Sequence, residues 1–176
     1  MRTVVFRVFA VLAFGFGGAA LPNAVQAQLQ TVDQTVFGMD CAPCAHAMEQ
    51  SLGSMEGVET VSVHLNDGVA ALDLTETNTV AYREILEAVS NGGFSAREAT
   101  LTVQGTVRRT GGHWVLETPA GEQFVLKTDG STGAKPSALQ DLAPSRRVIV
   151  TGRVSASSET EDGRWPVEVQ EVRSAA

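Results

Sequence analysis

Hydrophobic positions in the first half of the chain change period several times. Residues 31–37 have the pattern of a strand, and from Pro43 to Met55 apolar residues return every three or four positions, as on one face of a helix. A second helical pattern runs from Tyr82 to Val89. Alternating segments lie between the two. The predicted elements are strand 31–37, helix 43–55, strand 61–65, strand 70–74, helix 82–89 and a last strand from Phe94.

Turn and capping residues support these boundaries. Pro43 suits the first turn of a helix, where its missing N–H costs nothing, and Asn66-Asp67-Gly68 suits a tight hairpin turn. Asn91-Gly92-Gly93 ends the second helix. The order βαββαβ is the ferredoxin-like arrangement, in which two helices cover one face of a four-stranded antiparallel sheet. We therefore expect an α+β sandwich for residues 28–99.

After residue 100 the pattern changes to short strands separated by turns. Gly105 and Gly152 fall inside strands, as bends at the corners of a small barrel require. One helical turn is expected at 137–142, between the third and fourth strands. This order resembles the topology of an all-β, OB-like barrel. Its strands are expected at residues 101–109, 113–118, 122–127, 147–155 and 165–172.

The balance of acidic and basic residues also changes near residue 100. Residues 28–99 carry eleven acidic and two basic side chains, whereas residues 100–176 carry nine of each. Such a step favours two domains, at 28–99 and 100–176. Neither half has the basic surface that phosphate binding needs, so we expect no nucleic-acid partner. An acidic surface suits cations and basic proteins, or serves solubility alone.

The N-terminal segment has the pattern of a secretory signal peptide. Arg2 and Arg7 form a basic start, residues 8–21 carry no charge, and Val25-Gln26-Ala27 resembles a cleavage site. Fourteen uncharged residues are few against the roughly 20 that cross a bilayer. We expect cleavage of residues 1–27, no stable membrane insertion afterwards, and a periplasmic or secreted protein.

Both cysteines of the chain, Cys41 and Cys44, lie three residues apart. In an oxidising compartment cysteines normally form structural disulfides. A disulfide between these two would close almost no loop and add little stability by that mechanism. Metal binding and redox chemistry remain as explanations.

The residues around the cysteines resemble the heavy-metal-associated domain family. Gly38-Met39-Asp40-Cys41-Ala42-Pro43-Cys44 has the family's G-M-x-C-x-x-C pattern, Gly57-Val58-Glu59-Thr60-Val61 resembles its second strand, and Asn91-Gly92-Gly93-Phe94 its final loop. One departure lies in the first strand, where Val36 is apolar but Gln34 occupies the other inward position. Phe37 is then expected to face outward, toward the second segment or a partner.

The resemblance implies a soft metal ion, such as Cu(I), Zn(II) or Hg(II), bound by Cys41 and Cys44. Thiolates are soft ligands, and Cys44 lies near the positive end of a helix, which favours a thiolate. An open coordination position would let the thiol of a metal-transporting or metal-accepting partner protein enter. Met39 is expected to pack inside, and Phe94 to cover the site.

Asp40 bears on the identity of the metal. Copper-handling relatives often have Thr or Ser there, whereas Gly-Met-Asp-Cys resembles the N-terminal domains of zinc-, cadmium- and lead-exporting P-type ATPases. A carboxylate would suit Zn(II) better than Cu(I) as a third ligand, or Asp40 is simply exposed and binds nothing. His46, His64 and His113 are not expected to be ligands.

A thiol-disulfide oxidoreductase is the alternative function. Cys41-Ala42-Pro43-Cys44 resembles the redox motif of thioredoxins. Against it, no tryptophan precedes Cys41, the segment is short for that fold, and no proline occurs between Pro43 and Pro119. The chain carries no evident catalytic constellation, so we expect a metal-binding protein that is not an enzyme.

Overall fold

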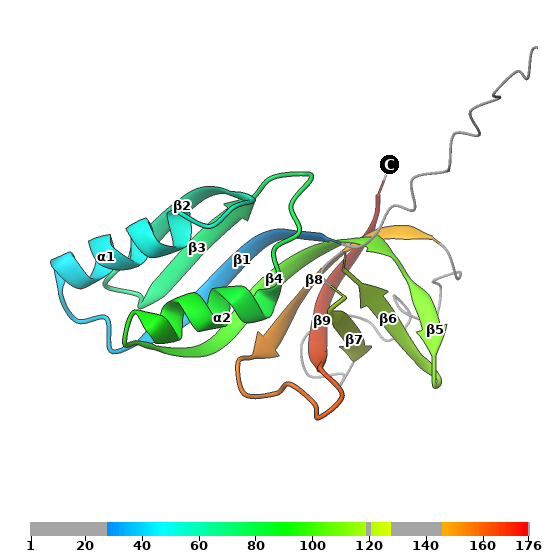
Figure 1. Cartoon of the computed structure of the whole chain (residues 1–176). Coiled ribbons are helices and arrows are strands. Elements are labelled where there is room, and N and C mark those ends of the chain that lie inside the picture. The colour runs from blue at the N-terminus through cyan, green and yellow to red at the C-terminus, as the bar shows by residue number, and fades with distance from the viewer. Residues whose placement is uncertain (1–27, 119–120, 128–145, 176) are drawn as a thin grey trace, which may run out of the picture.

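The computed structural model describes residues 28–118, 121–127 and 146–175 (Figure 1). The predicted signal peptide and the predicted helical turn at 137–142 lie outside these residues. The first half contains β1 (Gln28–Phe37), α1 (Ala42–Gly53), β2 (Val58–His64), β3 (Val69–Leu74), α2 (Tyr82–Asn91) and β4 (Ser95–Thr106). The second half contains β5 (Arg108–Thr110), β6 (His113–Glu117), β7 (Gln123–Lys127), β8 (Arg147–Ser155) and β9 (Arg164–Ser174).

The first half has the predicted ferredoxin-like topology. Its strands lie in the order β2-β3-β1-β4, and neighbouring strands run antiparallel. Both helices lie on the same side of this part of the sheet (Figure 1). In the part of the chain that the structure describes, no helix is long and apolar enough to span a membrane.

The second half extends the same sheet. From β4 the order continues β8-β9-β7-β6-β5, with β7 and β9 parallel and the other pairs antiparallel. Within the described ranges β2 and β5 are the two edges and do not pair with each other, so the sheet is not closed. Four of the five strands predicted after residue 100 are present as β6, β7, β8 and β9, whereas the predicted strand 101–109 is divided between β4, which begins at Ser95, and β5. The OB-like barrel is not confirmed.

Strand β4 belongs to both halves. It runs without interruption from Ser95 to Thr106, across the predicted domain boundary at residues 99 and 100. One edge of β4 pairs with β1 and the other with β8. The division into domains at 28–99 and 100–176 stays a prediction, and the described strands form one continuous sheet.

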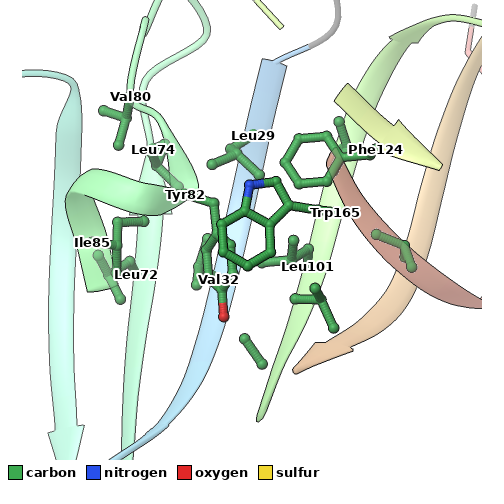
Figure 2. Close-up of a cluster of buried hydrophobic side chains, with 14 of the residues drawn as sticks. Leu29, Val32, Leu72, Leu74, Val80, Tyr82, Ile85, Leu101, Phe124 and Trp165 are labelled. Atoms are coloured by element: carbon green, nitrogen blue, oxygen red, sulfur yellow. The ribbon is translucent and has the colours of Figure 1, made fainter. Parts of the chain in front are cut away.

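The hydrophobic core is also continuous. Leu29, Val32 and Leu101 of the shared sheet are fully buried, and Figure 2 shows them in one cluster with Tyr82 of α2 and with Phe124 and Trp165 of the second half. The Tyr82 and Trp165 rings meet edge to face, with centroids 5.0 Å apart and planes at 77°. Such aromatic pairs stabilise by about 0.5–1.5 kcal/mol beyond the area they bury.

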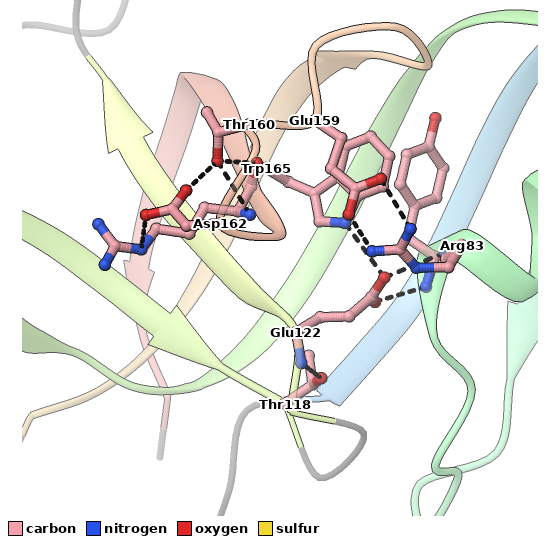
Figure 3. A network of polar contacts seen from close by, with 9 residues as sticks. Arg83, Thr118, Glu122, Glu159, Thr160, Asp162 and Trp165 are labelled. Atoms are coloured by element: carbon pink, nitrogen blue, oxygen red, sulfur yellow. Dashed lines mark hydrogen bonds and ion pairs between the residues drawn. The ribbon is translucent and has the colours of Figure 1, made fainter.

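A carboxylate from the second half caps the first turn of α2. Ala81, at the N-cap, has no side-chain oxygen that could accept a hydrogen bond from the free N–H groups of the helix. Glu122, which is 7% exposed, accepts hydrogen bonds from the N–H groups of Tyr82 at 2.6 Å and Arg83 at 3.1 Å, and from Trp165 Nε1 at 3.1 Å (Figure 3). Arg83 also forms an ion pair with Glu159.

Gln34 is the polar residue at an inward position of the first strand, and the structure explains how it is accommodated. Gln34 is completely buried; its Oε1 accepts a hydrogen bond of 2.9 Å from the Tyr82 hydroxyl, and its Nε2 donates to the carbonyl oxygens of Thr35 and Glu98 at 2.8 and 3.2 Å. The inward polar side chain is therefore satisfied by hydrogen bonds. Burial, and secondarily the charge of Glu122, raise the pKa of the Tyr82 phenol well above its ordinary value.

Candidate metal centre

The two cysteines lie where the chain passes from β1 into α1. Gly38 has φ +91° and Met39 is 4% exposed, so the chain turns at the glycine and is anchored by the methionine. Cys41 is the N-cap of α1, with extended backbone angles, and Ala45 N donates to its carbonyl oxygen at 3.0 Å. Pro43 occupies the first turn of α1, as predicted.

Cys41 and Cys44 are joined by a disulfide, and their Cα atoms are 5.1 Å apart. Cys44 N also donates a hydrogen bond to Cys41 Sγ at 3.1 Å. Cys41 is exposed and Cys44 is half-buried. The structure therefore brings the two predicted ligands together, in their oxidised form, at the N-terminal end of a helix.

An apolar groove of about 320 Å³ opens beside Cys44. Phe94 forms part of its wall, in agreement with the predicted apolar cover, and α1 forms the other side. A methyl group at Gly92 would lie 3.0 Å from the Phe94 ring, so the close approach of this ring depends on the glycine. The groove is lined by Pro43, Cys44, Ala47, Met48, Ser51, Gly92 and Phe94.

Among the described residues, the remaining candidates do not gather with the two cysteines into a metal-binding group. Met39 is buried, as predicted, whereas Asp40 is exposed. His46 is exposed and contacts Gln50 and Glu49 on its own helix. His64 and His113 are also exposed. Among residues 28–118, 121–127 and 146–175, no group of three or more His, Cys, Asp or Glu side chains is placed to hold a metal ion.

Phe37 faces outward, as predicted, and is 66% exposed. It does not pack against the second half. Instead the guanidinium carbon of Arg97 lies 5.2 Å from the centre of its ring, in a cation–π contact.

Two structural features were missed in the sequence, and one of them is at the site. One is the groove, for which a signal existed: Pro43, Ala47 and Ser51 are small residues four positions apart on one face of α1. The other is Glu122, which supports α2 from forty residues further along the chain. A single carboxylate between two short strands gives no local sign of such a contact.

Comparison with known proteins agrees with this geometry. Residues 34–95 match the family described as "Heavy-metal-associated domain". The copper chaperone CopZ of Bacillus subtilis is 32% identical over 59 residues, which are 34% of this chain and 84% of CopZ. The chain belongs to the heavy-metal-associated domain family.

Two further relatives extend the comparison. Copper-transporting ATPase 2 of Homo sapiens is 30% identical over 140 residues, which are 80% of this chain but only 8% of the ATPase. A copper-binding domain from HMA7, a P-type ATPase, is 31% identical in its crystal structure. That match covers 38% of this chain and 89% of the domain, with a TM-score of 0.36.

The heavy-metal-associated segment thus presents a cysteine pair on a helix N-terminus. Unpaired N–H groups and the dipole of α1 stabilise negative charge at this position, which favours thiolates once the disulfide is reduced. Thiolates are both the nucleophilic and the metal-binding form of cysteine. The arrangement is suited to soft-metal binding and to thiol exchange.

Proposed function

We propose that the protein binds one Cu(I) ion through Cys41 and Cys44 and captures it or passes it on. The observation that carries the proposal is the placement of both sulfurs at the N-terminus of α1, with Cα atoms 5.1 Å apart, in a chain of the heavy-metal-associated family. The relatives named above include a copper chaperone and a copper-transporting ATPase.

The binding step requires reduction of the disulfide. A dithiol reductant supplies two electrons and two protons, forms its own disulfide, and leaves Cys41 and Cys44 as thiols. Cu(I) then displaces the thiol protons and is held between two thiolates. Because Cys41 is exposed, the thiol of a metal-transporting or metal-accepting partner can enter the coordination sphere and take the ion.

Cu(I) is preferred to Zn(II) on the chemistry of the ligands. Structural zinc sites are almost always four-coordinate, and thiolates are favourable ligands for Cu(I). The exposed Asp40 is the neighbouring side chain that could favour Zn(II). Replacing it tests whether it contributes to selectivity.

We also propose that the protein is exported to the periplasm or secreted. The support is the sequence of residues 1–27, with its basic start, uncharged stretch and small residues before Gln28. Mass spectrometry of the protein that accumulates after expression of the full chain tests this, because cleavage would leave Gln28 as the first residue.

The test of metal binding is a competition titration. The purified protein is reduced, kept anaerobic, and titrated separately with Cu(I) and Zn(II) against chelators of known affinity. We expect one tightly bound Cu(I) per chain, lost in Cys41→Ser/Cys44→Ser and retained in the control His46→Gln, which changes an exposed residue of the same helix. Asp40→Thr should leave Cu(I) binding in place and weaken any Zn(II) binding.

Two outcomes would overturn the proposal. Cu(I) binding that survives the loss of both cysteines would place the site elsewhere. A reduced wild-type protein that binds no Cu(I) would remove the metal function altogether.

The disulfide gives specific support to a second candidate, a thiol-disulfide oxidoreductase. Cys41 and Cys44 are joined by a disulfide in which Cys41 is an exposed residue and Cys44 a half-buried one. Turnover of a disulfide substrate by the metal-free protein, lost in Cys41→Ser, would favour this candidate. No turnover together with tight Cu(I) binding would rule it out as the main function.

A further inference from the structure

Strand β2 forms one edge of the sheet. It pairs with β3 on one side, and no strand of the described residues pairs with its other side. Figure 1 shows α1 beside β2 at this edge. An unpaired edge presents backbone N–H and C=O groups to which a further strand can add, and proteins often prevent this with lysine or proline. The sequence of β2, VETVSVH, contains neither.

Alternation along β2 identifies the residues whose backbone groups point outward. The N–H of Val63 donates to Glu49 Oε1 of α1 at 3.1 Å, so it points away from β3. In an antiparallel pair, residues that bond to the partner strand alternate with residues that do not. Val61 lies two positions from Val63 in the same register with β3. Its N–H and C=O therefore also point outward.

Glu49 reaches this edge from the neighbouring helix. Its side chain is 40% exposed, and its other oxygen, Oε2, lies 3.8 Å from His46 Nδ1 on the same helix. A carboxylate accepts hydrogen bonds but donates none. Glu49 therefore satisfies the outward N–H of Val63 and occupies the place from which an added strand would offer a carbonyl oxygen.

The regular part of this edge is complementary to itself. A register shift near the start of β2 leaves residues 60–64 as its regular part. Two copies that run antiparallel about a twofold axis at Ser62 place Val61 of each copy opposite Val63 of the other. Outward-facing residues then meet outward-facing residues, as hydrogen-bonded pairs require. Residues 60–64 include no acidic side chain, so the paired strands would bring no carboxylates opposite each other.

We propose that Glu49, by occupying the Val63 N–H, keeps β2 from pairing with a second copy of this chain. In the self-complementary register the Val63 N–H of each copy donates to the Val61 carbonyl oxygen of the other, so both Glu49 side chains must leave before the strands can pair. The two Glu49 carboxylates would also meet at the same joint, where like charges repel. The proposal is independent of the metal function.

The experiment measures molar mass by size-exclusion chromatography with light scattering over a range of protein concentrations. High salt screens the net charge of −7. The full chain is expressed, its disulfide is left intact and a chelator is present, so that neither free thiols nor metal can link two copies. The test variant is Glu49→Ala. Glu87→Ala, which removes an exposed carboxylate from α2, is the matched control.

Two further variants separate the causes. Glu49→Gln removes the charge but keeps a side-chain oxygen that can accept from the Val63 N–H. Adding Val61→Pro to Glu49→Ala removes the outward N–H of Val61, which the new ladder needs, and an edge strand tolerates proline where its N–H faces solvent. Circular dichroism verifies that each variant is folded.

We expect Glu49→Ala to approach twice the monomer mass as its concentration rises. The wild type, Glu49→Gln, Glu87→Ala and the variant with Val61→Pro should remain monomers. A monomeric Glu49→Ala protein at every soluble concentration would overturn the proposal, as would a dimer that survives Val61→Pro. Equal dimerisation of the wild type, of Glu87→Ala or of Glu49→Gln would show that the hydrogen bond is not what prevents pairing.

Hydrogen exchange gives a second measurement that does not depend on the proline variant. In the Glu49→Ala dimer the Val61 amide proton should exchange more slowly than in the wild type, because it becomes bonded to the second copy. A dimer in which this amide exchanges as fast as in the wild type would have formed through another surface, which contradicts the proposal.

Discussion

Glu122 joins the two halves of the chain through side-chain hydrogen bonds. Its carboxylate satisfies two backbone N–H groups of α2 and the indole N–H of Trp165 at once. Thr118 N and Glu122 O are also hydrogen bonded, at 2.9 Å, which holds the turn that presents the side chain. Glu122 lies in the second half of the sequence, and it caps the N-terminus of α2, which lies in the first half.

We expect Glu122→Ala to lower the free energy of unfolding by about 2–4 kcal/mol, because two buried donors and one partly buried donor lose their acceptor. Urea denaturation followed by circular dichroism measures this. Glu117→Ala, which removes an exposed carboxylate one strand away, is the control and should change stability by less than about 1 kcal/mol. Similar losses in both variants would contradict the capping role.

Tyr82 provides a prediction for alkaline pH. Its pKa is raised in the folded protein by burial and by the charge of Glu122, whereas the unfolded phenol titrates near about 10. Above that pH the unfolded state loses a proton that the folded state keeps. Stability is therefore expected to be unaffected by this group below about pH 10 and to fall above it, by up to about 1.4 kcal/mol per pH unit.

Tyr82 is the only tyrosine of the chain, so phenolate absorbance reports it alone. The absorbance should rise together with unfolding, and the alkaline loss of stability should be smaller in Tyr82→Phe. A phenol that titrates near about 10 in the folded protein would show that it is not buried as described.

At the scale of elements, the connection from α1 to β2 depends on Gly57. Its φ is +92°, and a Cβ there would lie 2.9 Å from Asn78 Cβ and 3.0 Å from Val80 Cγ2. Asn78 in turn fixes this region by donating to the Leu29 carbonyl oxygen at 2.8 Å. The connection therefore needs both the positive φ and the missing side chain.

Gly57→Ala should destabilise the protein by about 2–4 kcal/mol, from backbone strain and steric overlap together. Gly111→Ala separates the two causes, because Gly111 also has positive φ but a Cβ there meets no atom within 4 Å. It should cost about 1–2 kcal/mol. Thermal unfolding of both variants provides the comparison, and equal shifts would remove the steric contribution.

Local patterns explain how much of the fold could be predicted. The helical spacing of Tyr82, Ile85 and Val89 gave α2 almost to the residue, because all three are buried on one face. The cysteines were identified because their motif is contiguous. The open sheet was not foreseen: pairing of β4 with β8 joins residues about fifty positions apart, and alternation within a strand does not reveal its partner.

For the whole molecule, one core and one sheet predict a single cooperative transition. Both tryptophans, Trp114 and Trp165, lie in the second half, whereas both described helices lie in the first. Tryptophan fluorescence and far-ultraviolet circular dichroism should therefore give coincident urea transitions. Two separated transitions would mean that residues 28–99 and 100–176 unfold as independent domains.

The position of β4 also determines how the native protein opens to solvent. Its amides are bonded on both sides, to β1 and to β8, so β4 leaves the sheet only when two ladders break together. The edge strands β2 and β5 each have one ladder to lose. In deuterated water the amide protons should therefore exchange first at β5 and β2 and last in the middle of β4, at the rate of global unfolding.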